Sequence, residues 1–164
     1  MMNTQSIDQL IKLLETLENV SNQLNDALKQ EKEILRTPDS QELLALTFTK
    51  KKLVSDLENL TKTTHLFLKK HNVEKGLYQL SNFISDVMPA DSQLLLNNSW
   101  STIQKLSIDN KKLNELNGSI IELNRRYTQR SLDILRGQIG TNSATYGSKG
   151  QVMSSRLSRS VNTA

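Results

Sequence analysis

The stretch that decides the fold is residues 7–35, IDQLIKLLETLENVSNQLNDALKQEKEIL. Its apolar residues recur at alternating spacings of three and four, which is the heptad pattern of a helix that packs along a narrow seam. With the first residue at heptad position a, the a and d positions are Ile7, Leu10, Leu14, Leu17, Ser21, Leu24, Leu28, Glu31 and Leu35. All of them are apolar except a serine and a glutamate. We therefore predict one helix from Ser6 to Arg36 with an apolar face along its whole length.

A second helix of the same kind follows the short link Thr37-Pro38-Asp39. Proline disfavours the helical conformation in the residue before it, so the first helix is expected to end at this link. From Ser40 to Lys70 the a and d positions are Leu43, Leu46, Lys50, Leu53, Leu57, Leu60, Thr64 and Phe67. Because so short a link turns the chain back on itself, the two helices are predicted to form an antiparallel hairpin.

The helical sequence that remains is divided by Met88-Pro89. Before this point, apolar residues that follow Gly76 predict a short amphipathic helix. After it, we predict a third long helix from Asp91 to Leu135. Its seam is expected at Leu106, Leu113, Leu116, Ile120, Leu123 and Tyr127. Together these elements predict an all-α fold, in which a long antiparallel hairpin and a third long helix form a coiled-coil-like bundle.

The composition of the chain changes at Arg136. Of the 21 Lys and Arg residues, 17 lie in residues 1–135 and balance all 17 Asp and Glu residues there. The other four lie in residues 136–164, so that end carries the whole formal charge of +4. It is also rich in Gly, Ser and Thr and has too few apolar residues to bury a core of its own. We predict a helical domain over residues 1–136 and a disordered, basic, flexible tail over residues 137–164.

Several classes of function find no support in the sequence. The absence of cysteine excludes disulfides, thiol nucleophiles and Cys-ligated metals. His65 and His71 are six residues apart, which does not place them on one helical face, and no third metal ligand accompanies them. The glycines of the tail lack the spacing of a phosphate loop. No secretory signal is recognisable, and no apolar run approaches the roughly 20 residues of a membrane helix. We expect a soluble, cytoplasmic protein that is not an enzyme, needs no cofactor and inserts into no membrane.

Two stretches are candidates for binding other proteins. In residues 113–123, LNELNGSIIEL, the residues Asn114, Asn117 and Gly118 lie together on one side of the predicted helix. A glycine inside a helix costs about 1 kcal/mol relative to alanine, so Gly118 is expected either to let another helix of the chain approach closely or to mark a docking point for a partner helix. In the tail, Tyr146 lies among small polar residues, which is typical of the anchor of a short linear motif. The alternative is a tail that only solubilises the protein.

Over most of its length the chain resembles the FlgN family of flagellar export chaperones. The resemblance rests on four segments, which are Glu31-Lys-Glu-Ile-Leu35, Lys50-Lys-Lys-Leu53, Asn114-x-x-Asn117-Gly118-x-x-Ile121 and Tyr146-Gly-Ser-Lys-Gly150. Any leucine-rich coiled coil matches the first two. The last two, in this order along the chain, are the discriminating pair.

This resemblance implies a cytoplasmic type III secretion chaperone. Such a protein binds the hook-associated subunits FlgK and FlgL, prevents their premature assembly and delivers them to the export gate. The residues that match the cargo-binding region are Leu123, Tyr127, Leu132, Ile134 and Leu135. The tail signature, here Tyr146, Gly147 and Gly150, would dock on the cytoplasmic domain of the export gate protein FlhA. The chain continues beyond Gly150, and the resemblance assigns no role to those last residues.

Two other functions stay open at this point. A coiled coil of this length suits a structural tether that associates with itself through the long helices. A basic tail suits a nucleic-acid-binding coiled coil, but four positive charges over 29 residues with a single aromatic residue are a weak electrostatic footprint. No binding to nucleic acid is therefore expected.

Overall fold

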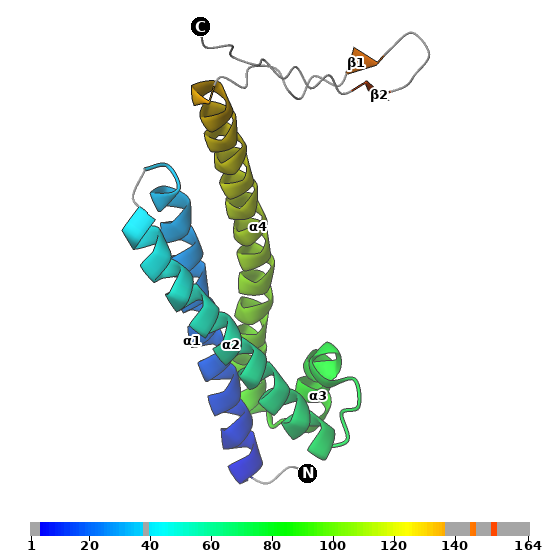
Figure 1. The fold of residues 1–164 in the computed structure, drawn as a ribbon. Helices are drawn as coiled ribbons and strands as arrows, with labels where there is room; N and C mark the ends of the chain where they lie inside the picture. The colour runs from blue at the N-terminus through cyan, green and yellow to red at the C-terminus, as the bar shows by residue number, and fades with distance from the viewer. Residues whose placement is uncertain (1–3, 38–39, 137–144, 147–151, 154–164) are drawn as a thin grey trace, which may run out of the picture. The chain divides into compact units, whose positions relative to one another are not determined.

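The computed structural model describes residues 4–37, 40–136, 145–146 and 152–153. In chain order the elements are α1 (Thr4–Ile34), α2 (Ser40–Lys70), the 3-10 helix η1 (Gly76–Gln79), α3 (Leu80–Val87), α4 (Ala90–Leu135), β1 (Thr145–Tyr146) and β2 (Val152–Met153) (Figure 1). The predicted all-α fold is confirmed, with α1 and α2 packed antiparallel and α4 as the third long helix. No helix among the described residues is long and apolar enough to cross a lipid bilayer.

The chain divides into two compact units, Met1–Ile121 and Glu122–Ala164. The predicted disordered tail falls largely on residues 137–144, 147–151 and 154–164, which lie outside the described residues. The four tail residues that are described form an antiparallel pair, in which Thr145 lies opposite Met153 and Tyr146 opposite Val152. This short strand pair was not predicted.

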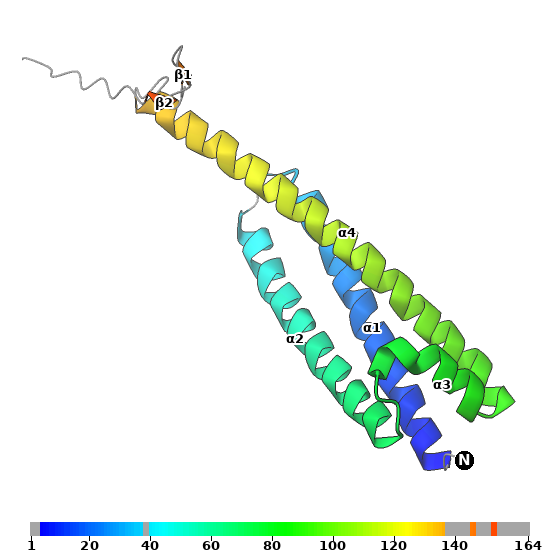
Figure 2. The same ribbon diagram turned by 90° about the vertical axis from the view of Figure 1, so that its right-hand side faces the viewer.

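In the first unit, α1 contributes to both apolar clusters of the core, and Figure 2 shows it between α2 and α4. The first cluster joins the start of α1 to the end of α2, α3 and the start of α4. Its buried members are Ile7, Leu10, Leu14, Leu17, Phe67, Leu68, Val73, Leu80, Phe83, Ile84, Met88, Leu96 and Ile103. The second cluster lies near the link from α1 to α2, and its buried members are Leu24, Ala27, Leu28, Ile34, Leu46 and Leu53. The predicted heptad positions of α1 are buried except Leu35, which is half-buried beside the buried Ile34.

The polar residues at predicted heptad positions of the hairpin all have partners. Lys50 Nζ donates to Glu31 Oε1 at 2.6 Å, so the charged residue of one seam pairs with the charged residue of the other. The hydroxyls of Ser21 and Thr64 donate to the carbonyl oxygens four residues before them. Because each polar group is hydrogen-bonded, its burial leaves no unpaired donor in the seam.

The turn from α3 into α4 is closed by side-chain hydrogen bonds. Pro89 cannot continue α3, and the amides of Ser92 and Gln93 donate to its carbonyl oxygen as α4 begins. The Gln93 side-chain amide Nε2 donates back to the carbonyl oxygens of Ser85 and Met88. The last turn of α3 is thus tied to the first turn of α4, which directs α4 along α1.

The predicted seam of α4 is wrong. The buried residues of this helix are Leu96, Ile103, Asn110 and Asn117, which repeat every seven residues. The predicted positions are half-buried at Leu106, Leu113 and Ile120 and exposed at Leu116, Leu123 and Tyr127. The physical reason is that α4 faces α1 with Asn110 and Asn117 at the last two positions of its buried seam, where they hydrogen-bond to α1. A search for apolar periodicity cannot recognise such a seam.

Candidate functional site

The last turns of α4 expose five large apolar side chains. Their exposed fractions range from 39% at Leu132 to 83% at Leu135. They are the five residues predicted to bind cargo, which are Leu123, Tyr127, Leu132, Ile134 and Leu135. All of them belong to the second unit. Exposed apolar side chains gathered in a few turns mark a place where a protein binds a partner, because covering them removes apolar area from water.

The helix places these five residues on two different faces. At 3.6 residues per turn, Tyr127 lies about one turn and Ile134 about three turns from Leu123, so these three share a stripe. Leu132 lies about two and a half turns from Leu123 and therefore on the opposite side. Leu135 lies about a third of a turn from the stripe, nearer to Leu132. A single straight helix can cover the first three residues but not all five.

A charged face runs beside the apolar stripe. The Glu122 carboxylate accepts hydrogen bonds from the guanidinium groups of Arg125 and Arg126, each at 2.9 Å from Nε, and Gln129 Nε2 donates to Asp133 Oδ1 at 2.8 Å. The hydrogen bonds from the two arginines lower the pKa of Glu122 from 4.5 to about 2. Pairs three and four residues apart stabilise a helix without help from tertiary packing. They therefore support a helical turn whose apolar residues are exposed.

The three residues of the Asn114-x-x-Asn117-Gly118 element differ in burial. Asn117 is buried, and its Nδ2 donates to the Leu28 carbonyl oxygen and to Glu31 Oε2, both at 2.8 Å. Asn114 and Gly118 are exposed. A Cβ added at Gly118 would meet no atom within 4 Å. The expectation that another helix of the chain approaches Gly118 closely is therefore wrong for the described residues, whereas docking of a partner helix stays a prediction.

A second buried asparagine was missed by the sequence analysis. Asn110 Oδ1 accepts from Asn25 Nδ2 at 2.8 Å, and Asn110 Nδ2 donates to the Ser21 carbonyl oxygen at 3.0 Å. The signal was present, because Asn110 and Asn117 continue the seven-residue spacing of the buried Leu96 and Ile103. Within the described part of the chain, the side-chain oxygen of Asn117 is the one buried side-chain polar atom without a hydrogen-bond partner.

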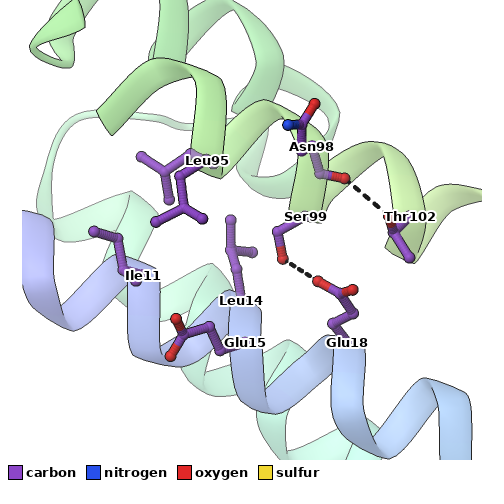
Figure 3. Close-up of a pocket in the computed structure, with 9 residues that line it drawn as sticks. Ile11, Leu14, Glu15, Glu18, Leu95, Asn98, Ser99 and Thr102 are labelled. Carbon is purple, nitrogen blue, oxygen red and sulfur yellow. Dashed lines mark hydrogen bonds between the residues drawn. The ribbon is translucent and has the colours of Figure 1, made fainter. Parts of the chain in front are cut away.

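A small cavity of about 220 Å³ lies where α1 meets the start of α4 (Figure 3). Ser99 Oγ donates to Glu18 Oε2 at 2.5 Å across it, and Ile11, Leu14 and Leu95 supply apolar walls. The Ser99 hydroxyl donates its hydrogen bond to a carboxylate, and no histidine lies beside it in the cavity lining. The arrangement is therefore a helix–helix contact and not a nucleophile site. Among the described residues, no three His, Asp or Glu side chains are placed to hold a metal ion.

The predicted gate-docking group lies in the tail. Tyr146 is the second residue of β1, whereas Gly147 and Gly150 lie outside the described residues. The structure therefore places the backbone of the tyrosine in a strand pair and leaves the predicted role of the group untested.

Comparison with known proteins identifies the family. A family model described as FlgN protein matches residues 1–154, a range that includes α1 to α4 and both strands. No curated protein and no solved structure matches the chain. The match favours the chaperone over the structural tether and the nucleic-acid-binding coiled coil. The chain belongs to the FlgN protein family, the non-enzymatic flagellar export chaperones for hook-associated proteins.

Proposed function

We propose that this chaperone works in the cytoplasm and holds FlgK and FlgL through the apolar end of α4. The observation that carries the proposal is the exposure of five large apolar side chains within residues 123–135. A subunit that polymerises outside the cell must present an apolar terminal helix, which needs a complementary surface until secretion. Leu123, Tyr127 and Ile134 supply such a surface, because their spacing of four and seven residues is that of a helix–helix seam.

The other predicted residues are given different parts in the same complex. Leu132 and Leu135 lie on another face, so we assign them to a second segment of the cargo or to a cargo helix that wraps around α4. Asn117 positions α4 on α1 through its hydrogen bonds to α1. The exposed Asn114 and Gly118 are left for a partner helix. Residues 1–136 would thus form the chaperone domain that holds cargo.

Delivery is assigned to the tail, residues 137–164. We propose that Tyr146, with Gly147 and Gly150, docks on the cytoplasmic domain of FlhA. A flexible segment that folds on binding loses part of its interaction energy to ordering, which keeps the complex releasable. Release is required because the chaperone is not exported with its cargo.

The cargo surface is tested by two matched sets of variants. Leu123→Ser, Tyr127→Ser and Ile134→Ser together should abolish co-purification with FlgK and FlgL, since each buried apolar side chain contributes about 1.5–3 kcal/mol. Leu132→Ser with Leu135→Ser is the control for the other face and should weaken binding less. Because all five side chains are exposed, neither variant should lose helical content, and circular dichroism checks this. Unchanged affinity of the triple variant for both subunits would refute the proposed surface.

The delivery role is tested by Tyr146→Ala. This variant should keep its affinity for FlgK and FlgL and lose affinity for the FlhA cytoplasmic domain, measured by titration calorimetry with each partner. Tyr146→Phe keeps the ring and should retain most of the FlhA affinity. If Tyr146→Ala weakens both interactions, or neither, the proposed division of labour between helix and tail is wrong.

A further inference from the structure

The first unit contains an open groove of about 810 Å³ that the cargo surface does not use. The groove is lined by residues of α1, α2, η1, α3 and α4, and Figure 2 shows α1 between α2 and α4. The buried Leu17 and Leu24 of α1 form its floor, and Leu57 and Ile103 belong to its walls. Three long helices around one groove leave the position that a fourth helix takes in a four-helix bundle.

The lining of this groove has a chemical character of its own. Among the described residues that line it, none is charged. The half-buried Trp100 and the exposed Ile108 add apolar surface on the α4 side. A charged side chain pressed into such a lining would lose water without gaining an ion-pair partner. The groove therefore selects an apolar face that carries no charge.

At one end the groove continues into a second cavity of about 600 Å³, whose lining is basic. The two cavities share Thr61, Leu77 and Tyr78, and Tyr78 is 97% exposed at their junction. The second cavity is lined by Lys62 and Lys75 together with a histidine, and no acidic residue is found among its described lining residues. This end of the groove therefore selects a negative charge.

The basic end is built by an unusual turn. Gly76 has a φ of +56°, in the left-handed region, and its Cα lies against the ring of His65, so that a Cβ there would lie 2.1 Å from Nδ1. Glycine is the residue that accepts both conditions without strain. The turn carries Lys75 and Leu77 into the cavity beside α2, which gives the basic end a defined shape.

We propose that this groove binds an amphipathic helix of another protein, with its uncharged apolar face on Leu24, Leu57 and Ile103 and an acidic end at Lys62 and Lys75. The charge pattern of the groove argues for this occupant, because it is uncharged in the middle and basic at one end. The proposed site shares no residue with the cargo surface at the end of α4. It is therefore a second docking surface, and its test is independent of the first.

Trp100 provides the measurement, since it is the only tryptophan of the chain and lines the groove. The probes are three synthetic helical peptides: one with a Leu/Ala face and two glutamates at one end, one with lysines in place of the glutamates, and a scrambled version of the first. The glutamate peptide should bind the full-length protein and shift the Trp100 emission to shorter wavelength. The lysine peptide should bind at least about tenfold more weakly. The scrambled peptide should leave the emission unchanged.

Variants show whether the binding occurs in this groove. Lys62→Glu with Lys75→Glu should reverse the preference between the two charged peptides. Tyr78→Ala and Ile108→Ser should weaken the binding of both charged peptides. Both positions are exposed, so these substitutions should leave the fold intact. Lys29→Glu with Lys112→Glu, at exposed positions outside the groove, is the control and should keep the preference of the wild type. The Leu123→Ser, Tyr127→Ser, Ile134→Ser variant should bind the peptides normally.

Three results would overturn the inference. Trp100 emission could be unaffected by the glutamate peptide, or both charged peptides could bind the wild type equally. The emission could also shift with protein concentration in the absence of peptide, which would mean that a second copy of the chain occupies the groove. Failure of the cargo-surface variants to bind FlgK leaves these measurements unaffected, so the two proposals can fail separately.

Discussion

At the scale of single residues, the described bundle is defined by buried polar side chains in and beside the helix seams. Asn25, Asn110, Asn117 and Glu31 all find partners across the helix contacts. Asn110 and Asn117 are seven residues apart, so if α4 slid along α1 by one heptad, one of them would take the place of the other and the second would lose its hydrogen bonds to α1. Leucines alone would tolerate such a shift, so the polar residues specify the register at some cost in stability.

Replacing Lys50 of the Glu31–Lys50 ion pair is expected to cost more stability than replacing Glu31. The Glu31 side chain is 3% exposed and that of Lys50 is 22% exposed, so only the lysine reaches water. Lys50→Met should therefore lower the free energy of unfolding by about 3 kcal/mol, because it leaves a buried carboxylate without its cation. Glu31→Gln should cost less, since Lys50 can be hydrated and the amide still accepts from Asn117. Chemical denaturation of both variants tests this, and equal costs would contradict it.

The two glycines of the described helical region should respond in opposite directions to alanine. Gly118→Ala adds a methyl group in open space within a helix and should raise the free energy of unfolding by about 1 kcal/mol. Gly76→Ala should lower it by about 1–2 kcal/mol, because its positive φ disfavours any side chain. Thermal unfolding measures both. His65→Ala in the Gly76→Ala background should relieve the clash with the ring but not the backbone strain, and full recovery would argue against a role of φ.

At the scale of elements, α4 has two differently stabilised parts. Up to Ile121, its buried seam packs on α1 and the core clusters. From Glu122 onward, no residue of the helix is buried, and ion pairs along its surface support the helical conformation instead. A partner can therefore bind this part without first displacing a packed core. Because ion pairs stabilise the second part, its helical conformation should be more sensitive to pH than that of the first part.

Acid should destabilise the second part of α4 through Glu122. Its pKa is lowered from 4.5 to about 2 in the folded protein, so the carboxylate contributes stability above about pH 4.5 that is lost as the pH falls towards 2. We expect the amide protection factors of residues 122–130, which are corrected for the intrinsic pH dependence of exchange, to fall over this window. Glu122→Gln should exchange faster than wild type at neutral pH and similarly at pH 2. Parallel exchange profiles of the two proteins at every pH would show that Glu122 contributes nothing.

At the scale of the whole molecule, the proposed functions are assigned to different segments of the chain. The first unit, Met1–Ile121, holds both core clusters and the uncharged groove. The five exposed apolar residues and Tyr146 belong to the second unit, Glu122–Ala164. An export chaperone has to hold one partner while it meets another, and separate segments allow both contacts at once. The tail should then be dispensable for folding.

Truncation after Gly137 tests this independence. Every member of the two core clusters precedes residue 122, so removal of the tail should leave the helical content and the unfolding midpoint nearly unchanged. Circular dichroism with thermal unfolding measures both quantities. A large loss of either would show that the tail is part of the fold and would remove the basis for a separate delivery segment.

The sequence by itself determined the hairpin and the end of α4. The heptad positions of α1 and α2, the end of α1 ahead of Pro38 and the length of α4 follow from local rules, because apolar periodicity and proline act within one segment of the chain. The five apolar residues at the end of α4 were named from the resemblance to the FlgN family, and the structure shows that all five are exposed.

Only the tertiary structure decided which face of α4 is buried. Asn110 and Asn117 occupy the seam because acceptors on α1 lie opposite them, and the leucines on the neighbouring face stay half-buried or exposed. Burial of a carboxamide depends on partners that are more than 80 residues away in the chain, so apolar periodicity within α4 does not identify it. The groove beside Trp100 has the same origin, since it exists only where residues of five separate elements meet.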